Sequence, residues 1–226
     1  MSPTARERAR AETIEQIKQI ARGHLAVDGP NLSLRAVARD LGVVSSAVYR
    51  YFASRDELLT ALIVDGYDAL AQAVEEAEAA VPRRNVAGRW LAFGHAAREW
   101  ALEQPHEYAL LYGTPVPGYT APADTADRPL LVLLGLLADA VERGAVELPS
   151  DRIAAAVRAE VAALAGSPGF EGVPVNLVAR ALTVWAQLHG TLGFEVFGHF
   201  PYAIDDPDAY FDHQLRVMAR HLGLAR

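Results

Sequence analysis

Residues 33–52 read Ser-Leu-Arg-Ala-Val-Ala-Arg-Asp-Leu-Gly-Val-Val-Ser-Ser-Ala-Val-Tyr-Arg-Tyr-Phe, a segment with the pattern of two short helices around a tight turn. Ser33 is an expected helix N-cap, since its hydroxyl can accept an otherwise unpaired backbone N–H. The apolar residues that follow share one helical face: Leu34, Val37, Ala38 and Leu41. Gly42 stands where a helix ends with positive φ. The first half of the stretch therefore predicts a short helix that ends in a tight turn.

A second helix is predicted directly after this turn. Ser45 is its expected N-cap, and Val48 and Phe52, four residues apart, can anchor it to a core. Helix, glycine-containing turn, helix is the pattern of a helix-turn-helix unit, whose second helix enters the major groove of DNA. A plain helical hairpin is the alternative interpretation of the same pattern.

The flanking residues favour a compact three-helix unit. Ser54-Arg-Asp-Glu57 is a capping-box pattern, and it predicts a helix from Ser54 to about Ala80. An earlier helix is predicted to end at Asp28-Gly29-Pro30. Its apolar residues also share one face: Ile14, Ile17, Ala21 and Leu25.

Over about residues 10–65 the chain resembles the TetR family of bacterial repressors. The strings that carry the resemblance are Leu32-Ser33-Leu34-Arg35, Val37-Ala38, Leu41-Gly42-Val43, Ala47-Val48-Tyr49-Arg50-Tyr51-Phe52 and Arg55-Asp56-Glu57-Leu58-Leu59. The resemblance implies a DNA-binding unit, and its major-groove positions fall on Ser45, Ser46, Ala47, Tyr49 and Tyr51.

These positions imply different kinds of contact. Ala47 can contact a thymine methyl, and serine hydroxyls can bond to base edges. Tyr49 and Tyr51 are expected to hold phosphates, and so are three residues at either side: Ser33, Arg35 and Arg55. Arg50 stands where the family more often has an aromatic residue, so it is expected to add a guanine or phosphate contact. Val44 brings no polar base contact.

The charge of the chain is unevenly distributed. The 226 residues carry a net charge of −7. Residues 1–60 hold nine Lys/Arg and seven Asp/Glu, a balance of +2, and the remainder has a balance of −9. Arg6, Arg8 and Arg10 are expected to form a basic N-terminal arm that reaches DNA; a solvated terminus is the alternative. The chain thus has a mildly basic unit on an acidic body. This distribution indicates that specific contacts and dimerisation contribute more to DNA binding than the overall charge does.

Composition excludes several classes of protein. Half of the residues are hydrophobic and 22% are charged, as in globular proteins. The chain has no cysteine, so disulfides and thiolate metal sites are excluded. We see no apolar segment typical of a secretory signal at the N-terminus. The longest apolar run, Leu130–Ala138, is too short to span a membrane. We therefore expect a cytoplasmic protein with no membrane partner.

The body of the chain shows helical patterns and no convincing strand pattern. The expected helices are at about 85–103, 105–112, 126–143, 151–165, 175–198 and 207–223. We therefore predict an all-α fold with a helix-turn-helix DNA-binding domain over residues 1–60. A helical ligand-binding and dimerisation domain is predicted over residues 61–226.

Two body segments resemble one branch of the TetR family, which has a C-terminal domain of the Trp-His-Gly type: Trp185-Ala-Gln-Leu-His189-Gly190 and His106-Glu-Tyr108-Ala-Leu-Leu-Tyr112-Gly-Thr-Pro115. The resemblance implies that helices 175–198 and 207–223 form a four-helix interface in a homodimer. In the first, Ala186, Gly190 and Gly193 allow a close approach. In the second, an apolar stripe is expected to face the partner, with ordinary core as the alternative: Phe211, Leu215, Met218 and Leu222.

Aromatic and polar residues of the body are candidates for a ligand pocket. Members of the family usually bind small molecules there, so an effector of unknown identity is expected. The candidate contacts are Trp90, Phe93, Arg98, Tyr108, Tyr112, Trp185 and His189. Ordinary core is the alternative for each aromatic residue taken singly.

Enzyme and metal-site patterns are weak in this chain. Glu103 and His106 have a spacing found in di-iron bundles, but Pro105 interrupts the helix and the motif has no second copy. His95 with Glu99, and Glu195 with His199, form pairs without a third ligand. We therefore expect no catalytic residue, metal or cofactor. The sequence predicts a homodimeric repressor of a palindromic operator, released by its effector. A helical enzyme and an adaptor without DNA binding are the alternatives.

Overall fold

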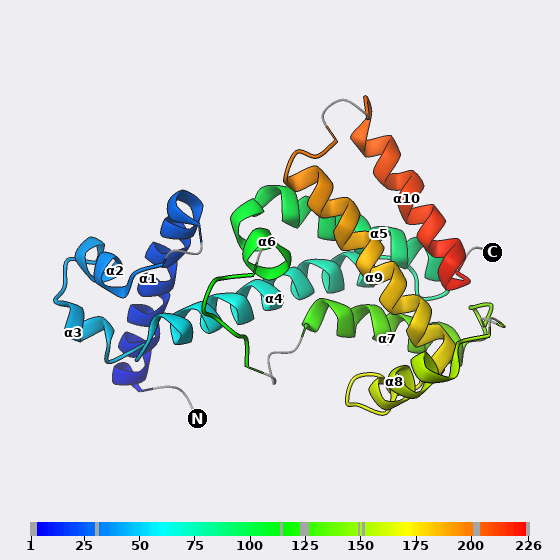
Figure 1. Ribbon diagram of the computed structural model, residues 1–226, viewed down its shortest axis with the longest axis horizontal. Coiled ribbons are helices and arrows are strands. Elements are labelled where there is room, and N and C mark those ends of the chain that lie inside the picture. Colours follow the sequence, from blue (N-terminus) through cyan, green and yellow to red (C-terminus); the bar gives the residue numbers. More distant parts are fainter. Residues whose placement is uncertain are drawn as a thin grey trace. The chain divides into compact units, whose positions relative to one another are not determined.

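A computed structural model describes residues 4–29, 32–113, 115–122, 127–148, 150, 152–200 and 204–224. Over these residues the protein consists of ten α-helices and contains no strand (Figure 1). The all-α prediction is confirmed. The chain forms two compact units, each made of two segments. The first unit comprises residues 1–66 and 104–126, and the second comprises 67–103 and 127–226. That residues 1–60 bind DNA and residues 61–226 bind a ligand and dimerise stays a prediction.

The first unit holds the helix-turn-helix. It contains the start of α4 (Arg55–Ala79) and four whole helices: α1 (Ala5–Asp28), α2 (Leu34–Asp40), α3 (Ser45–Val48) and α6 (Pro105–Tyr112). Figure 1 shows α2 and α3 beside α1. The apolar faces predicted from spacing meet in one core, which includes Ile17, Ala21, Leu34, Val37, Val48, Phe52 and Leu58.

Local capping and turn chemistry follow the sequence at most positions. Ser33 Oγ accepts the Ala36 N–H at 3.5 Å, and Gly42 has φ of +74°, as predicted. The Glu57 N–H donates to Ser54 Oγ at 3.1 Å at the start of α4. The expectation for Ser45 is wrong. Val44 occupies the cap position of α3 with extended backbone and no side-chain cap.

The three arginines of the expected basic arm lie on a helix. Thr4 caps α1 in a complete capping box with Glu7, so the helix begins at Ala5. Arg6, Arg8 and Arg10 are therefore exposed positions on a helix. At the other end, Gly29 closes α1 with φ of +58°, and the predicted role of Pro30 lies outside the described residues.

The second unit is a helical bundle built around buried aromatic and leucine side chains. It contains the rest of α4 and five helices: α5 (Val86–Glu103), α7 (Arg128–Glu142), α8 (Ala155–Ala165), α9 (Val175–Val196) and α10 (Pro207–Leu222). The helix α9 packs against α5, α7, α8 and α10 (Figure 1). In the described part of the chain, no helix has the length and apolar character that crossing a membrane requires.

The apolar stripe of α10 is core, and its interpretation as a dimer interface is wrong. Phe211, Leu215, Met218 and Leu222 are each buried within the chain itself. Leu215 packs against Gly94 of α5, where a larger residue would collide with it. The Trp90 indole N–H also donates to the Leu215 carbonyl at 2.9 Å. An apolar stripe is needed equally for a core and for an interface, so spacing alone could not separate the two.

Candidate nucleic-acid interface

A shallow depression of about 530 Å³ on the first unit gathers several predicted DNA contacts. Four of the nine predicted residues line it: Ser33, Arg35, Tyr49 and Arg55. The other lining residues are Leu32, Leu34, Ala53 and Ser54. The depression is therefore formed where the beginning of α2, the residue after α3 and the beginning of α4 come together.

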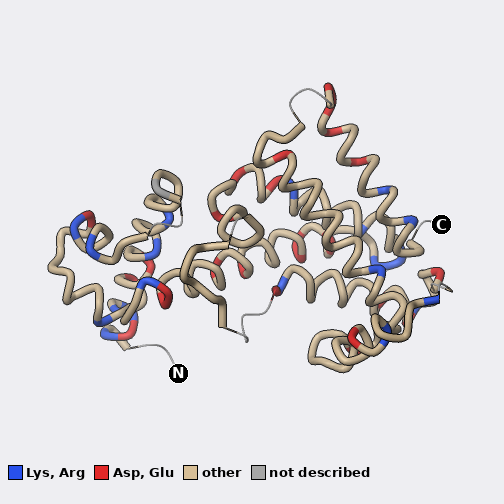
Figure 2. The backbone as a smooth tube through the Cα atoms, in the orientation of Figure 1, with Lys and Arg blue, Asp and Glu red and all other residues tan. Residues whose placement is uncertain are grey.

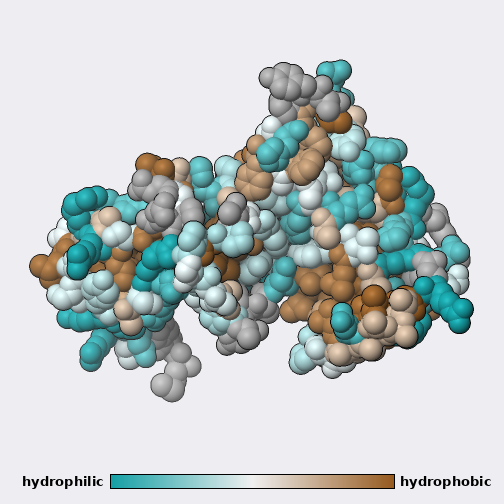
Figure 3. All heavy atoms as spheres, viewed as in Figure 1, coloured by the Kyte–Doolittle hydropathy of each residue, from teal (hydrophilic) through white to brown (hydrophobic). Residues whose placement is uncertain are grey.

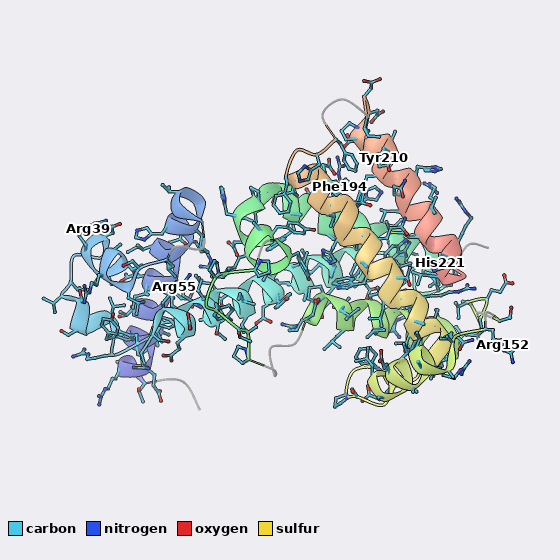
Figure 4. The ribbon with its side chains drawn as sticks, viewed as in Figure 1. Arg39, Arg55, Arg152, Phe194, Tyr210 and His221 are labelled. Carbon is cyan, nitrogen blue, oxygen red and sulfur yellow. The ribbon has the colours of Figure 1, made fainter. Side chains whose placement is uncertain are left out.

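The chemistry of this depression suits an anion. The first turn of the long helix α4 presents backbone N–H groups, and a helix N-terminus carries partial positive charge. Arg35 is exposed at one side, and Arg55 lies at the other, 3.6 Å from the Asp56 carboxylate. Figure 4 shows Arg55 on α4 and Arg39 on α2. Ser54 was missed by the sequence interpretation because its hydroxyl was assigned only to capping.

The residues around α3 divide into an exposed and a partly buried set. Ser46, Tyr49 and Arg50 are exposed, whereas Ser45, Ala47 and Tyr51 are half-buried. Val48 lies beneath them in the core. All six of these residues therefore have accessible surface.

The turn before α3 is unusually apolar for an exposed surface. Val43 is 40% exposed and Val44 is 73% exposed. Figure 3 shows hydrophobic atoms at the α2–α3 end of the first unit. Val44 offers no polar group to a base, but exposed methyl groups are of the kind that can pack against the methyl group of thymine.

Arg10 of α1 contacts Tyr51, one of the residues that are predicted to bind a DNA phosphate. The Arg10 guanidinium lies over the Tyr51 ring, 5.3 Å from its centroid. A cation at this distance is attracted to the ring face. The sequence could not reveal this contact because the two residues are far apart in the chain.

Ion pairs moderate the charge of the first unit. Arg39 and His24 both contact the Asp40 carboxylate, and their hydrogen bonds hold the pKa of Asp40 below its usual range. Lys18 is buried and contacts Asp65 at 2.7 Å and Glu15 at 2.6 Å. Burial lowers the pKa of Lys18, but these hydrogen bonds outweigh it and raise the pKa overall. Basic and acidic residues therefore alternate along these helices (Figure 2).

Five of the seven candidate ligand contacts lie in the second unit. Four of them form a continuous row of rings: Trp90, Phe93, Trp185 and His189. Trp90 and Phe93 are fully buried, whereas Trp185 and His189 are half-buried. Although His189 as a whole is half-buried, its ring Nε2 is buried. This burial lowers the pKa of His189 to about 3, so its imidazole is neutral near pH 7.

The remaining candidates have different surroundings. Arg98 donates to both Glu195 oxygens, at 2.8 and 2.6 Å, and also pairs with Asp208; its pKa is raised, first by the hydrogen bonds to Glu195. Tyr108 and Tyr112 lie on α6 in the first unit, with ring centroids 5.4 Å apart. Burial raises the pKa of the Tyr108 phenol. The seven residues are thus divided between the two units.

A second depression, of about 390 Å³, lies among α4, α5 and α7 in the second unit, and none of the seven candidates lines it. At its wall Arg89 is 4% exposed and pairs with Glu78 at 2.6 Å and with Asp139. Burial lowers the pKa of Arg89, but the pairing with Glu78 and Asp139 outweighs it. The sequence interpretation missed this buried arginine.

The histidine pairs considered as metal ligands have other partners. His95 Nε2 lies 3.3 Å from Asp212 Oδ1, and Glu195 binds Arg98. Among the described residues, no group of three His, Asp or Glu side chains is arranged to hold a metal ion.

Two family descriptions match this chain. Residues 21–62 match the family described as bacterial regulatory proteins, tetR family. Residues 90–218 match the family described as tetracyclin repressor-like, C-terminal domain, which alone covers more than half of the chain.

Individual relatives match nearly the whole chain. The HTH-type transcriptional regulators Rv1816 of Mycobacterium tuberculosis and Mb1846 of Mycobacterium bovis are each 38% identical over 223 residues, covering 95% of this chain and 92% of theirs. The crystal structure of the regulatory protein SCO4313 has a TM-score of 0.75 at 35% identity, covering 95% of this chain and 98% of its own. The TetR family transcriptional regulator PfmR from Thermus thermophilus shares the fold, with a TM-score of 0.54 at 17% identity over 93% of this chain and 99% of its own.

Proposed function

Because the chain belongs to the TetR family of bacterial transcriptional regulators, we propose that it is a homodimeric repressor of a palindromic operator, released by a small-molecule effector. Members of the family are regulators and not enzymes, so the enzyme alternative is set aside. The observation that carries the proposal is the depression that brings Ser33, Arg35, Tyr49 and Arg55 together at the start of α4.

The proposed contacts with DNA are of two kinds: some bind the phosphate backbone and others recognise the base sequence. Arg35, Tyr49, Arg55 and the first turn of α4 bind phosphates and fix the unit on the duplex. Ser45, Ser46 and Ala47 face base edges, Tyr51 holds a phosphate, and Arg50 adds a guanine or phosphate contact. Since Val44 and Ala47 are apolar, the half-site is expected to contain thymine.

The proposed dimer uses the exposed face of α9. Ala186 and Gly190 are exposed, and the space beside Gly190 is open. Further along the same helix, Phe194 is 52% exposed, and Figure 4 shows it near the C-terminal end of α9. A small-residue surface lets a second helix approach closely, and a two-fold partner gives a palindromic site two reading units.

The proposed effector is a small aromatic or apolar molecule. Trp185 and His189 are its best-supported contacts, because they are the partly exposed members of the ring row. Phe93 contacts Trp185, and Trp90 stacks on Phe93. The roles of Arg98, Tyr108 and Tyr112 stay predictions. Effector binding acts through α4, which runs from the second unit into the first. A ligand releases DNA only if it binds one state of the protein more tightly than the other.

Selection from random DNA tests this function. The full chain is incubated with a pool of random duplexes several helical turns long, and the retained duplexes are sequenced over successive rounds. An inverted repeat with thymine in each half-site supports the proposal. Failure to enrich any sequence contradicts DNA recognition, and enrichment of a single unrepeated site contradicts the dimer.

The effector is tested separately with the selected duplex. A library of small aromatic and apolar compounds is screened for stabilisation of the protein against heat. We expect a stabilising compound to lower the affinity for the selected duplex. A compound that stabilises the protein and leaves DNA binding unchanged contradicts effector-controlled release.

A further inference from the structure

The turn that follows α6 belongs to the core of the DNA-reading unit. Val116 is 8% exposed and lies in the same apolar cluster as Phe52, Leu58 and Leu59. Tyr119 packs against this cluster from outside. We call residues 115–119 the post-α6 turn. It contacts α4, the helix that follows the reading helix, although more than fifty residues separate Tyr119 from Thr60 in sequence.

The turn has a defined backbone. Pro117 and Gly118 are its central residues, and Gly118 has φ of +74°. The Tyr119 N–H donates to the Val116 carbonyl at 3.1 Å. Proline followed by a positive-φ glycine is the pairing that a type II turn favours. The turn therefore presents Val116 and Tyr119 in a fixed arrangement.

A hydrogen-bond chain connects this turn with the first turn of α4. Tyr119 Oη lies 3.0 Å from Thr60 Oγ1, and Thr60 Oγ1 donates to the Asp56 carbonyl at 2.8 Å. The Thr60 hydroxyl has one proton, and it is used in the bond to Asp56. Tyr119 must therefore donate and Thr60 accept. Asp56 is adjacent to Arg55, which lines the depression.

The helix before the turn is anchored to the same unit. Arg22 of α1 contacts Glu107 of α6 at 3.5 Å and Asp65 of α4 at 2.7 Å. Leu110 of α6 packs against the apolar cluster. Since the turn is held through α6 as well as through its own contacts, it can act as a fixed support rather than as a free loop.

We propose that Tyr119 and Thr60 are positioning residues for DNA binding. They do not touch DNA. They fix the position of the first turn of α4, so that Ser54 and Arg55 can contact the phosphate backbone. This inference rests on the proposed function and extends the DNA-binding machinery to a segment beyond the helix-turn-helix.

Three variants test it: Tyr119→Phe, Thr60→Val and the double variant. Each removes hydroxyl groups and keeps the shape of the side chain. Affinities are measured in the full chain, over a series of salt concentrations, for the selected duplex and for a random-sequence duplex. Arg55→Ala is the positive reference. Tyr210→Phe is the matched control, since Tyr210 is a half-buried tyrosine of the second unit (Figure 4).

We expect Tyr119→Phe to weaken binding by up to roughly fivefold, because the freed first turn of α4 must then be ordered on DNA at a cost no larger than the hydrogen bond that held it. The loss should be equal on both duplexes, because phosphate contacts carry no sequence information. The affinity of Tyr119→Phe for DNA should depend less steeply on salt concentration than that of the wild type. Arg55→Ala is the reference for this change, since its slope of log affinity against log salt is expected to fall by about 1. The double variant should bind no more weakly than the weaker single variant, since both changes break the same chain of bonds.

Two results overturn the inference in distinguishable ways. If the wild type binds the selected duplex and Tyr119→Phe binds it equally at every salt concentration, the positioning role is wrong and the proposed function stands. If the wild type binds neither duplex, both are wrong. A weakened Tyr119→Phe with an unchanged salt slope assigns a general structural role to the tyrosine and also contradicts the inference.

Discussion

The turn between α2 and α3 depends on a single residue, Gly42. Its φ of +74° lies in a region that side chains disfavour, while the space around it is open. Gly42→Ala is therefore expected to destabilise the protein by roughly 1–2 kcal/mol through backbone strain alone. Urea unfolding followed by circular dichroism measures this.

Gly23 provides the control for this substitution. It lies within α1, also with open space around it, and its φ is ordinary. Gly23→Ala should stabilise the protein by about 0.5–1 kcal/mol, because alanine favours helix. Equal effects of the two substitutions would contradict the account of the turn.

His189 is expected to make the second unit less stable in acid. Its pKa is about 3 in the folded chain because of burial, and about 6.5 in an unfolded chain. Between these values the unfolded chain binds a proton that the folded chain does not. Stability is therefore lost as the pH falls below about 6.5, by up to about 1.4 kcal/mol per pH unit.

The variant His189→Gln removes this dependence. All three tryptophans lie in the second unit, so their fluorescence follows the unfolding of that unit in urea. Between about pH 7 and pH 5 the variant should lose less stability than the wild type. His213→Gln, a change at an exposed histidine of α10, is the control. If His189→Gln loses as much stability between about pH 7 and pH 5 as the wild type does, His189 is not the source of the acid sensitivity.

Residue roles set by neighbours along the chain were predictable from sequence. The cap at Ser33, the positive φ of Gly42 and the burial of Val48 all follow from local spacing. The cap at Ser45 failed because Val44 already has the extended backbone of a cap residue. The contact between Arg10 and Tyr51 depends on how two distant helices meet, which spacing cannot express.

The close contact of α5 with α10 is the most demanding packing feature between helices. A Cβ added to Gly94 would collide with the Leu215 side chain. Gly94→Ala is therefore expected to destabilise the second unit by about 1–3 kcal/mol, the usual cost of overpacking. Tryptophan fluorescence in urea measures it, since Trp90 bonds to the Leu215 backbone at this contact.

Gly135 is the matched control within the same unit. It lies on α7 with open space around it, so alanine there should be neutral or stabilising through helix propensity. If Gly94→Ala proved as harmless as Gly135→Ala, the packing of α5 against α10 described here would be wrong.

The limits of α5, α6, α9 and α10 were predictable within two residues, because proline, glycine and acidic caps mark their ends. Their partners were not. The helix α6 was expected to supply Tyr108 and Tyr112 to a pocket of the body, yet it packs with α1 in the first unit. Helix ends are local properties, whereas the choice of packing partner depends on the whole chain.

The proposed dimer can be tested without disturbing the fold of each chain. Gly190 is exposed on α9 and has no neighbour that a side chain would strike. Gly190→Glu should therefore keep the helix and place a charge in the proposed interface. Light scattering is expected to show a shift from dimer to monomer, and thermal unfolding should show whether each chain stays folded.

Gly23→Glu makes the same change on an exposed face of α1 and should leave the mass unchanged. A dimer that persists in Gly190→Glu at micromolar concentration would rule out this face of α9. Leu215 is unsuitable for such a test, since it is buried and a charge there would disrupt the core.

The surface around Tyr49 is the proposed DNA-binding surface. Tyr49 is 45% exposed and lines the depression, so its removal should spare the fold. The most direct measurement is fluorescence anisotropy of the selected duplex titrated with wild type and with Tyr49→Ala, at one salt concentration and with the oligomeric mass of both proteins checked. We expect Tyr49→Ala to keep the mass of the wild type and to bind the duplex at least tenfold more weakly, a loss of about 1.4 kcal/mol. Undiminished affinity in Tyr49→Ala would contradict this expectation.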